Sequence, residues 1–207
     1  MKILALDSSS STASIAFVLL QDSAREVLFR SDVPHKRSDS SAIFEGLRLA
    51  VAECGLPQAV CTGLGPGSYN GLRAGIAAAR ALATALNIPL FSLPSPLALP
   101  GPSSGFWAVG DARGGHYWIA GIKDGNFLQQ PCLLTPVETA TLVHSNPAFP
   151  IYSASPLPGF DHLIPATPDA ARLAILSEKA DLCSATPEPL YLKPPHITAP
   201  RTASPRP

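Results

Sequence analysis

Proline is distributed very unevenly along this chain, and no residue limits regular structure more strongly. Of 23 prolines in 207 residues, only Pro34, Pro57 and Pro66 precede residue 89. Proline lacks the backbone N–H that helix interiors and central strands use. The first part of the chain can therefore form long helices and paired strands, whereas the second part must consist of short elements joined by loops. Residues 94–105, rich in proline, glycine and serine, are predicted to link the two parts.

Hydrophobic periodicity divides the first part into regular elements. Apolar and β-branched runs bounded by polar turns predict strands, and apolar residues at spacings of three and four predict helices. The predicted order is βββαβαβ, with strands over 2–6, 14–20 and 25–30, a helix over 43–54, a strand over 59–62, a glycine loop over 63–71, a helix over 71–86 and a strand over 89–93.

The second part repeats this order more weakly, about 104 residues further along. Strands are expected over 106–110, 116–123, 127–134 and 149–153, and helices over 136–144 and 168–181. A duplicated βββαβα unit explains a length between one and two average domains. The predicted fold class is therefore duplicated α/β, with a first domain over 1–93, a linker over 94–105, a second, truncated domain over 106–193 and a disordered proline-rich tail over 194–207.

Composition excludes several functions. The chain has 15 basic and 15 acidic residues, so its net charge is zero, which argues against a protein that binds nucleic acid by itself. No two histidines are spaced as a metal-binding HxxxH pair, and the four scattered cysteines are expected to be free thiols. No apolar run is long enough for a signal peptide core or a membrane span. We expect a cytoplasmic protein without membrane contact, metal or cofactor.

The segment with the most suggestive chemistry is the glycine loop between a strand and a helix. Glycines at this position let backbone N–H groups turn inward, and the helix N-terminus adds partial positive charge, so the pair can hold a phosphate. The residues that would form a vestigial phosphate or nucleotide loop are Asp7, Ser8, Gly65, Gly67 and Ser68. The alternative is structural: Asp7 caps the serine turn after its strand, and Ser68 is a helix N-cap.

Four segments together resemble the TsaB (YeaZ) family. They read ILALDSSSSTASIAFV, GLGPGSYNGLRAGIAAARALA, VGDARGGHYWIAGI and EPLYLK, and the resemblance extends over about residues 1–193. It implies the actin/Hsp70/sugar-kinase (ASKHA, ribonuclease H-like) fold. It also implies a non-catalytic subunit that supports TsaD in making threonylcarbamoyladenosine (t6A) on tRNA, a relative of the M22 glycoproteases.

The alternative is an enzyme of the same fold, namely an ATP-dependent kinase, a carbamoyltransferase or an M22-type metallopeptidase. The catalytic relative carries an HxxxH pair on its first helix, but here His35 is followed four residues later by Asp39. A late Gly-Gly-x-x-Asn segment for adenosine is also missing. We therefore predict no catalytic residues and no metal ligands.

The second predicted helix is apolar or small on two sides. It is either sandwiched within the chain or buried against another subunit, and we predict an interface formed by Gly71, Leu72, Gly75, Ala78, Ala79, Leu82 and Ala85. The resemblance implies TsaD as the heterodimer partner, the ATPase TsaE as a further partner, a homodimer as an alternative, and contact with tRNA only indirectly.

Overall fold

The first half of the molecule is a five-stranded mixed sheet, seen in a computed structural model that describes residues 1–22, 24–34, 41–160, 162–179 and 187–193. Its strand order is β3-β2-β1-β4-β5. The first three strands pair antiparallel, and β4 and β5 add parallel to β1. The strands are β1 (Lys2–Asp7), β2 (Thr12–Gln21), β3 (Ala24–Pro34), β4 (Ala59–Gly63) and β5 (Leu90–Leu93).

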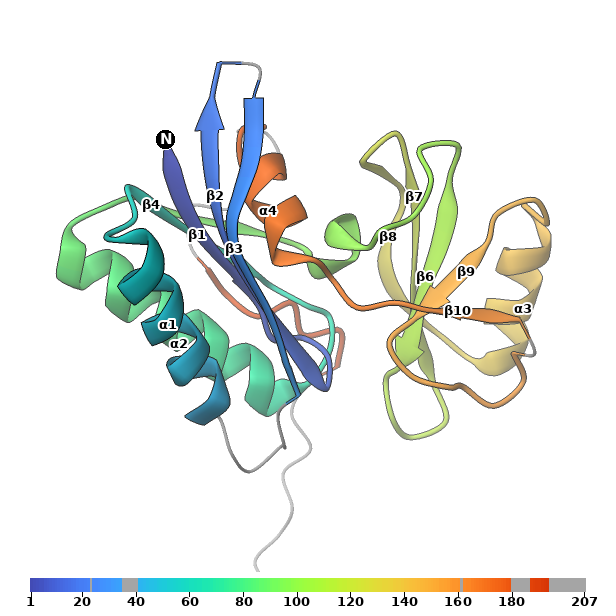
Figure 1. Cartoon of the computed structure of the whole chain (residues 1–207). Coiled ribbons are helices and arrows are strands. Elements are labelled where there is room, and N and C mark those ends of the chain that lie inside the picture. Colours follow the sequence, from blue (N-terminus) through green and yellow to red (C-terminus); the bar gives the residue numbers. More distant parts are fainter. Residues whose placement is uncertain (23, 35–40, 161, 180–186, 194–207) are drawn as a thin grey trace, which may run out of the picture.

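Two helices cover one face of this sheet, on the left in Figure 1. They are α1 (Ser41–Cys54) and α2 (Tyr69–Leu86). Every residue of β1 after Lys2 is buried, because its alternate side chains pack on opposite faces of the sheet. Leu4 and Leu6 join the core beneath α1 and α2, whereas Ile3 and Ala5 face the other side.

The second half repeats the same topology. Its strand order, given in the same direction as for the first sheet, is β8-β7-β6-β9-β10. Strands β6, β7 and β8 pair antiparallel, and β9 and β10 add parallel to β6. The elements are β6 (Phe106–Asp111), β7 (Tyr117–Lys123), β8 (Asn126–Leu134), α3 (Pro136–His144), β9 (Ile151–Ser153) and β10 (Leu163–Pro165). The described residues between β9 and β10 contain no helix, which is the main difference from the first half. The short strand β10 was not predicted.

The last helix, α4 (Ala170–Leu176), returns to the first sheet. Its residues Ala170, Ala171, Leu173 and Ala174 pack against the face of the first sheet opposite α1 and α2. The 3-10 helix η1 (Ser95–Ala98) lies beside it. Leu97 and Leu176 also contact the core of the second sheet. Helix α4 and η1 thus fill the space between the two sheets, and Figure 1 shows the layers α1/α2, sheet, α4, sheet and α3.

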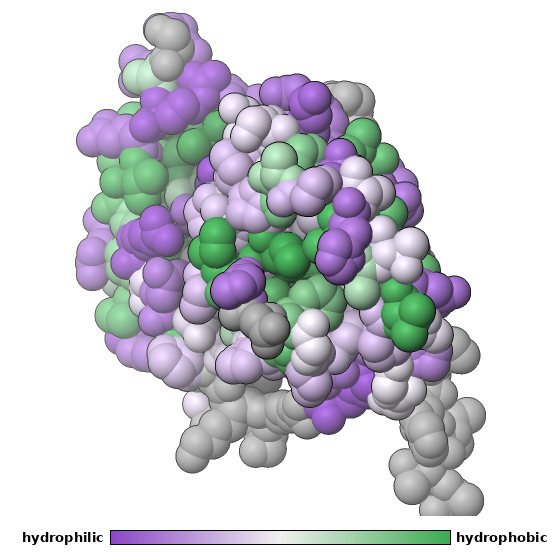
Figure 2. All heavy atoms as spheres, turned by 90° about the vertical axis from the view of Figure 1, so that its right-hand side faces the viewer, coloured by the Kyte–Doolittle hydropathy of each residue, from purple (hydrophilic) through white to green (hydrophobic). Residues whose placement is uncertain are grey.

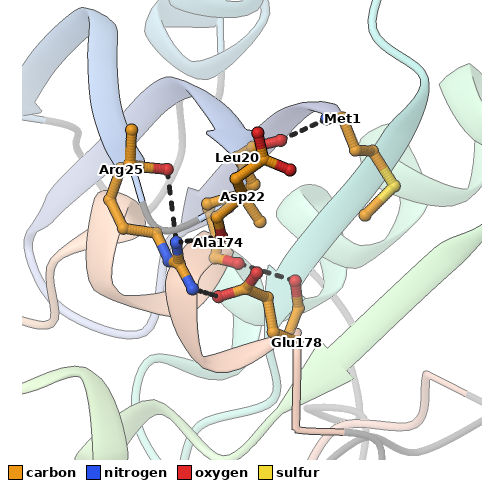
Figure 3. A network of polar contacts seen from close by, with 8 residues as sticks. Met1, Leu20, Asp22, Arg25, Ala174 and Glu178 are labelled. Carbon is orange, nitrogen blue, oxygen red and sulfur yellow. Dashed lines mark hydrogen bonds and ion pairs between the residues drawn. The ribbon is translucent and has the colours of Figure 1, made fainter.

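Arginines of β3 hold α4 at both ends. Arg30 lies 3.3 Å from Asp169, the N-cap residue of α4, and Arg25 lies 2.8 Å from Glu178 just beyond its end. Figure 3 shows the second of these pairs, together with the hydrogen bond from Arg25 to the carbonyl of Asp22 in the β2–β3 turn. Half-exposed pairs of this kind add little stability, so apolar packing accounts for the attachment of α4.

These findings confirm the duplicated α/β fold and change how the segments are assigned. Residues 94–105 were predicted to be a linker, but residues 95–99 are buried, because η1 packs against α4. The predicted second-domain helix over 168–181 is α4, which belongs by its contacts to the first sheet. The tail over 194–207 and the pair His35 and Asp39 lie outside the described residues.

Candidate functional site

The candidate site is the corner where β1 ends beside the glycine loop after β4. The Asp7 side chain is buried there, and both of its carboxyl oxygens accept hydrogen bonds. One oxygen accepts hydrogen bonds from the Ser9 hydroxyl at 2.6 Å and the Ser9 backbone N–H at 2.9 Å, and the other accepts from the Ser95 hydroxyl at 2.5 Å. Burial raises the pKa of Asp7 above its usual range, and the hydrogen bonds from both serines partly oppose that shift.

The glycine loop closes directly on this corner. The backbone N–H of Gly65 donates to the Ser95 hydroxyl at 2.9 Å, and that of Ser68 donates to the Ser9 carbonyl at 2.7 Å. A Cβ on Gly67 would lie 2.1 Å from the same carbonyl oxygen, so only glycine allows this approach. The fold therefore brings the predicted loop residues together. However, the N–H groups of Gly65 and Ser68, which were expected to bind a phosphate, donate to other groups of the protein.

Gly63 shows how tightly the corner is filled. A Cβ on this residue would lie 1.8 Å from an Asp7 carboxylate oxygen and 2.6 Å from the Ser95 hydroxyl. Within the described parts of the chain, no group of three or more histidine, cysteine, aspartate or glutamate residues is arranged to hold a metal ion. The geometry suits a structural junction that joins β1, the glycine loop and η1.

Sequence reasoning missed the two serines that complete this junction. Ser9 lies in the predicted serine turn, but its hydroxyl was not assigned to Asp7. Ser95 lies 88 residues from Asp7, in the segment predicted to be a linker. No periodicity or motif pairs these positions, because η1 reaches β1 only through the tertiary fold. The Ser68 N-cap was anticipated, and its hydroxyl accepts the N–H of Gly71 at 3.4 Å.

Most of the predicted interface on α2 is part of the monomer core, which corrects that prediction. The five residues buried within the chain are Gly71, Leu72, Gly75, Ala78 and Ala79. A Cβ on Gly75 would lie 2.1 Å from the Ser8 hydroxyl and 3.0 Å from Leu6, so α2 sits directly on β1. Leu82 is half-buried and Ala85 is exposed. The small residues allow α2 to approach its own sheet closely.

The exposed side of α2 instead faces a C-terminal strap (residues 187–193). The Leu190 N–H donates to the carbonyl of Leu64 in the glycine loop at 2.8 Å. The Tyr191 ring stacks on Tyr69 of α2 with centroids 5.2 Å apart. Arg80 donates to the carbonyl of Pro187 at 3.1 Å. The strap and the outer face of α2 border an open groove of about 750 Å³.

The equivalent corner of the second half is a turn. The Asp111 carboxylate accepts the backbone N–H of Arg113 at 2.7 Å, which caps the turn after β6. Figure 2, which views the molecule from the side of the second sheet, shows apolar residues near the middle of that face with polar residues around them. Exposed apolar side chains of this half include Val137 of α3 and Ile164 of β10.

The two sheets have the same strand order, and the first strand of each ends in an aspartate, Asp7 or Asp111. This arrangement is that of a duplicated α/β protein of the actin/Hsp70/sugar-kinase class. The family model described as TsaD, tRNA N6-adenosine threonylcarbamoyltransferase, matches residues 35–99. That stretch contains α1, β4, α2 and β5.

Two sequence relatives and two solved structures each align with nearly the whole chain. The uncharacterized proteins Rv3421c of Mycobacterium tuberculosis and Mb3455c of Mycobacterium bovis are each 30% identical over 201 residues, which cover 93% of this chain and 92% of theirs. YeaZ from Pseudomonas aeruginosa superposes with a TM-score of 0.73 at 19% identity, over 92% of this chain and 99% of that one. A second Pseudomonas aeruginosa structure, of an uncharacterized protein with similarity to peptidase YeaZ, superposes with a TM-score of 0.71 at 20% identity. It covers 93% of this chain and 99% of that one. The chain belongs to one family with the two mycobacterial proteins, and its fold is that of YeaZ.

Proposed function

We propose that this chain is a non-catalytic subunit that supports a TsaD-type enzyme in forming threonylcarbamoyladenosine on tRNA. The observation that carries the proposal is the filled corner at Asp7. An enzyme that transfers a phosphoryl or carbamoyl group must aim charged groups and N–H donors at its substrate. Here both Asp7 oxygens accept serine hydrogen bonds, and the loop N–H groups of Gly65 and Ser68 donate within the chain.

Two further observations support an association with a TsaD-type enzyme. The TsaD family model matches the segment that contains the α1–α2 helix pair. The outer side of that pair exposes Phe44, Leu49 and Tyr69, three large apolar side chains that a partner subunit could cover. We infer that TsaD binds through these helices, that TsaE docks on the resulting complex, and that tRNA is held by TsaD.

Light scattering after size exclusion tests the proposal, with the full chain alone, with its cognate TsaD, and with TsaD and TsaE. We expect a stable heterodimer with TsaD, and t6A formation by TsaD that depends on this chain. The chain alone should not hydrolyse ATP and should bind tRNA only weakly, since its net charge is zero. Steady ATP turnover that disappears in the Asp7→Asn variant would instead establish an enzyme. TsaD that forms t6A equally well without this chain would refute the supporting role.

No helix of the described residues is long and apolar enough to cross a membrane. We propose that the complex works in the cytoplasm, because its tRNA substrate is there.

A further inference from the structure

The C-terminal strap (residues 187–193) contacts both halves of the molecule. On the first half, the Leu190 N–H donates to the carbonyl of Leu64 at 2.8 Å. The Tyr191 ring stacks on the Tyr69 ring at the start of α2, with centroids 5.2 Å apart. Because Leu64 belongs to the glycine loop after β4, these contacts attach the strap beside the corner where β1 ends.

The end of the strap reaches the turn that follows β6 in the second half. The Lys193 amine donates to the carbonyl of Arg113 at 2.8 Å. Arg113, Gly114 and Gly115 have φ angles of 62°, 62° and 72°, so three successive residues are left-handed. This conformation is uncommon for a residue with a side chain, and it persists where neighbouring groups hold it. The hydrogen bonds of Arg113 to Lys193 and to the Asp111 carboxylate are two such contacts.

The strap therefore gives the two halves a second attachment. The first attachment is the apolar packing of α4 and η1 between the two sheets. Figure 1 shows the strap in red, lower in the view than α4. The strap joins corresponding ends of the two sheets, because the glycine loop follows β4, the parallel neighbour of β1, and the turn follows β6. Two bodies with one attachment can rock about it, and a second attachment limits that motion.

The contacts of the strap are weak enough to open without unfolding either half. Tyr191 is 44% exposed, and the Lys193 hydrogen bond lies at the surface. A ring stack or a hydrogen bond of this kind changes the ratio of closed to open strap by only about two- to tenfold. Arg80 holds the start of the strap through the Pro187 carbonyl at 3.1 Å. Leu190 and Lys193 are three residues apart, so losing either contact frees the chain that leads to the other.

We propose that residues 190–193 are a detachable clamp between the two halves. While closed, the clamp ties the glycine loop of the first half to the turn over residues 111–116 of the second half and fixes the halves relative to each other. Its two ends open together. This inference goes beyond the proposed function and does not depend on it.

Amide hydrogen exchange of the isotope-labelled full chain, measured by NMR, tests whether the ends open together. The Leu190 N–H reports on the first half, and the Ala112 N–H, which donates to the His116 carbonyl at 3.0 Å, reports on the turn of the second half. In the wild type, both should be protected far less than amides at the centre of β1, which exchange only on global unfolding. Tyr191→Leu removes the ring stack, and Lys193→Met removes the amine. We expect each variant to raise exchange at both reporters by about two- to tenfold.

The matched control is Lys123→Met at the exposed end of β7. It also replaces a lysine of the second half, and it should leave the exchange of Leu190 and Ala112 unchanged. A variant that raises exchange only at its own end of the strap would show that the ends open separately. A variant that raises exchange at neither reporter would show that the removed contact does not hold the strap. Either result overturns the clamp.

Residual dipolar couplings test whether the clamp fixes the halves relative to each other. In the wild type, the couplings of both halves should fit one alignment tensor. In the double variant Tyr191→Leu/Lys193→Met, we expect the tensor of the second half to shrink relative to that of the first, because the second half then moves about α4 and η1. A double variant whose halves still fit one tensor would show that α4 and η1 hold them alone, which also overturns the inference.

Discussion

Substituting Gly75 by alanine tests whether the small-residue side of α2 is core or interface. A Cβ at this position would lie 2.1 Å from the Ser8 hydroxyl and 3.0 Å from the Leu6 side chain. Both neighbours are buried, Leu6 on β1 and Ser8 directly after it, and the Ser8 hydroxyl donates to the Gly71 carbonyl at 2.8 Å. The added methyl group can be accommodated only if α2 moves away from the sheet or that hydrogen bond breaks.

The expected magnitude combines three effects. Overpacking costs about 1–3 kcal/mol, and losing the Ser8–Gly71 hydrogen bond costs about 1 kcal/mol. Replacing glycine by alanine inside a helix returns about 1 kcal/mol. The net loss of unfolding free energy is therefore about 1–3 kcal/mol, which lowers the melting temperature by about 2–12 °C in a chain of this size.

Circular dichroism melts and urea titrations measure this loss. Gly46→Ala on α1 is the matched control, because its Cβ would meet only the flexible end of Ile15, so we expect a smaller effect. The double variant Ser8→Ala/Gly75→Ala should lose less stability than the sum of the two single variants, since removing the hydroxyl relieves the clash. A Gly75→Ala protein that melts like the wild type but no longer binds TsaD would refute the core assignment and restore the predicted interface.

The remaining predictions concern the corner and α4. Burial raises the folded-state pKa of Asp7 above its ordinary value of 3.8. Its contribution to stability is therefore present below that pH and is lost as the pH rises toward the folded pKa, by about 1.4 kcal/mol per pH unit. Asparagine does not titrate, so the unfolding free energy of Asp7→Asn minus that of the wild type should increase with pH above about 3.8; a difference that stays flat in urea titrations from pH 4 to 7 would contradict the burial of the charge. Leu173→Ala should lower the unfolding free energy by about 2–5 kcal/mol, because Leu173 is fully buried between α4 and the first sheet. Ile175→Ala, at a half-buried position of the same helix, should cost less, and equal losses in denaturant titrations would argue against the docking of α4 described here.

Local patterns in the sequence determined most of the elements. Apolar and β-branched runs bounded by polar turns placed every described strand except β10 to within a few residues, because a strand that pairs in a buried sheet needs such side chains. Side-chain chemistry also fixed the caps. Thr135, Pro136 and Glu138 have the spacing of a local helix-start signal, and the structure has the full capping box there. The duplication, and with it the fold class, followed from the order of these elements.

Tertiary structure decided which surfaces those elements bury. Periodicity shows that α2 has two apolar sides, but it cannot show which neighbour covers each, and the answer for Gly75 is the chain's own β1. Ser95 and Asp7, 88 residues apart, meet only because η1 packs between the two sheets. Helix α4 follows the second sheet in sequence yet packs on the first, since apolar burial depends on which face is uncovered and not on the order of the chain. The groove beside Arg73 and Arg80 has the same origin, because the strap that forms its second wall lies about 100 residues further along the chain.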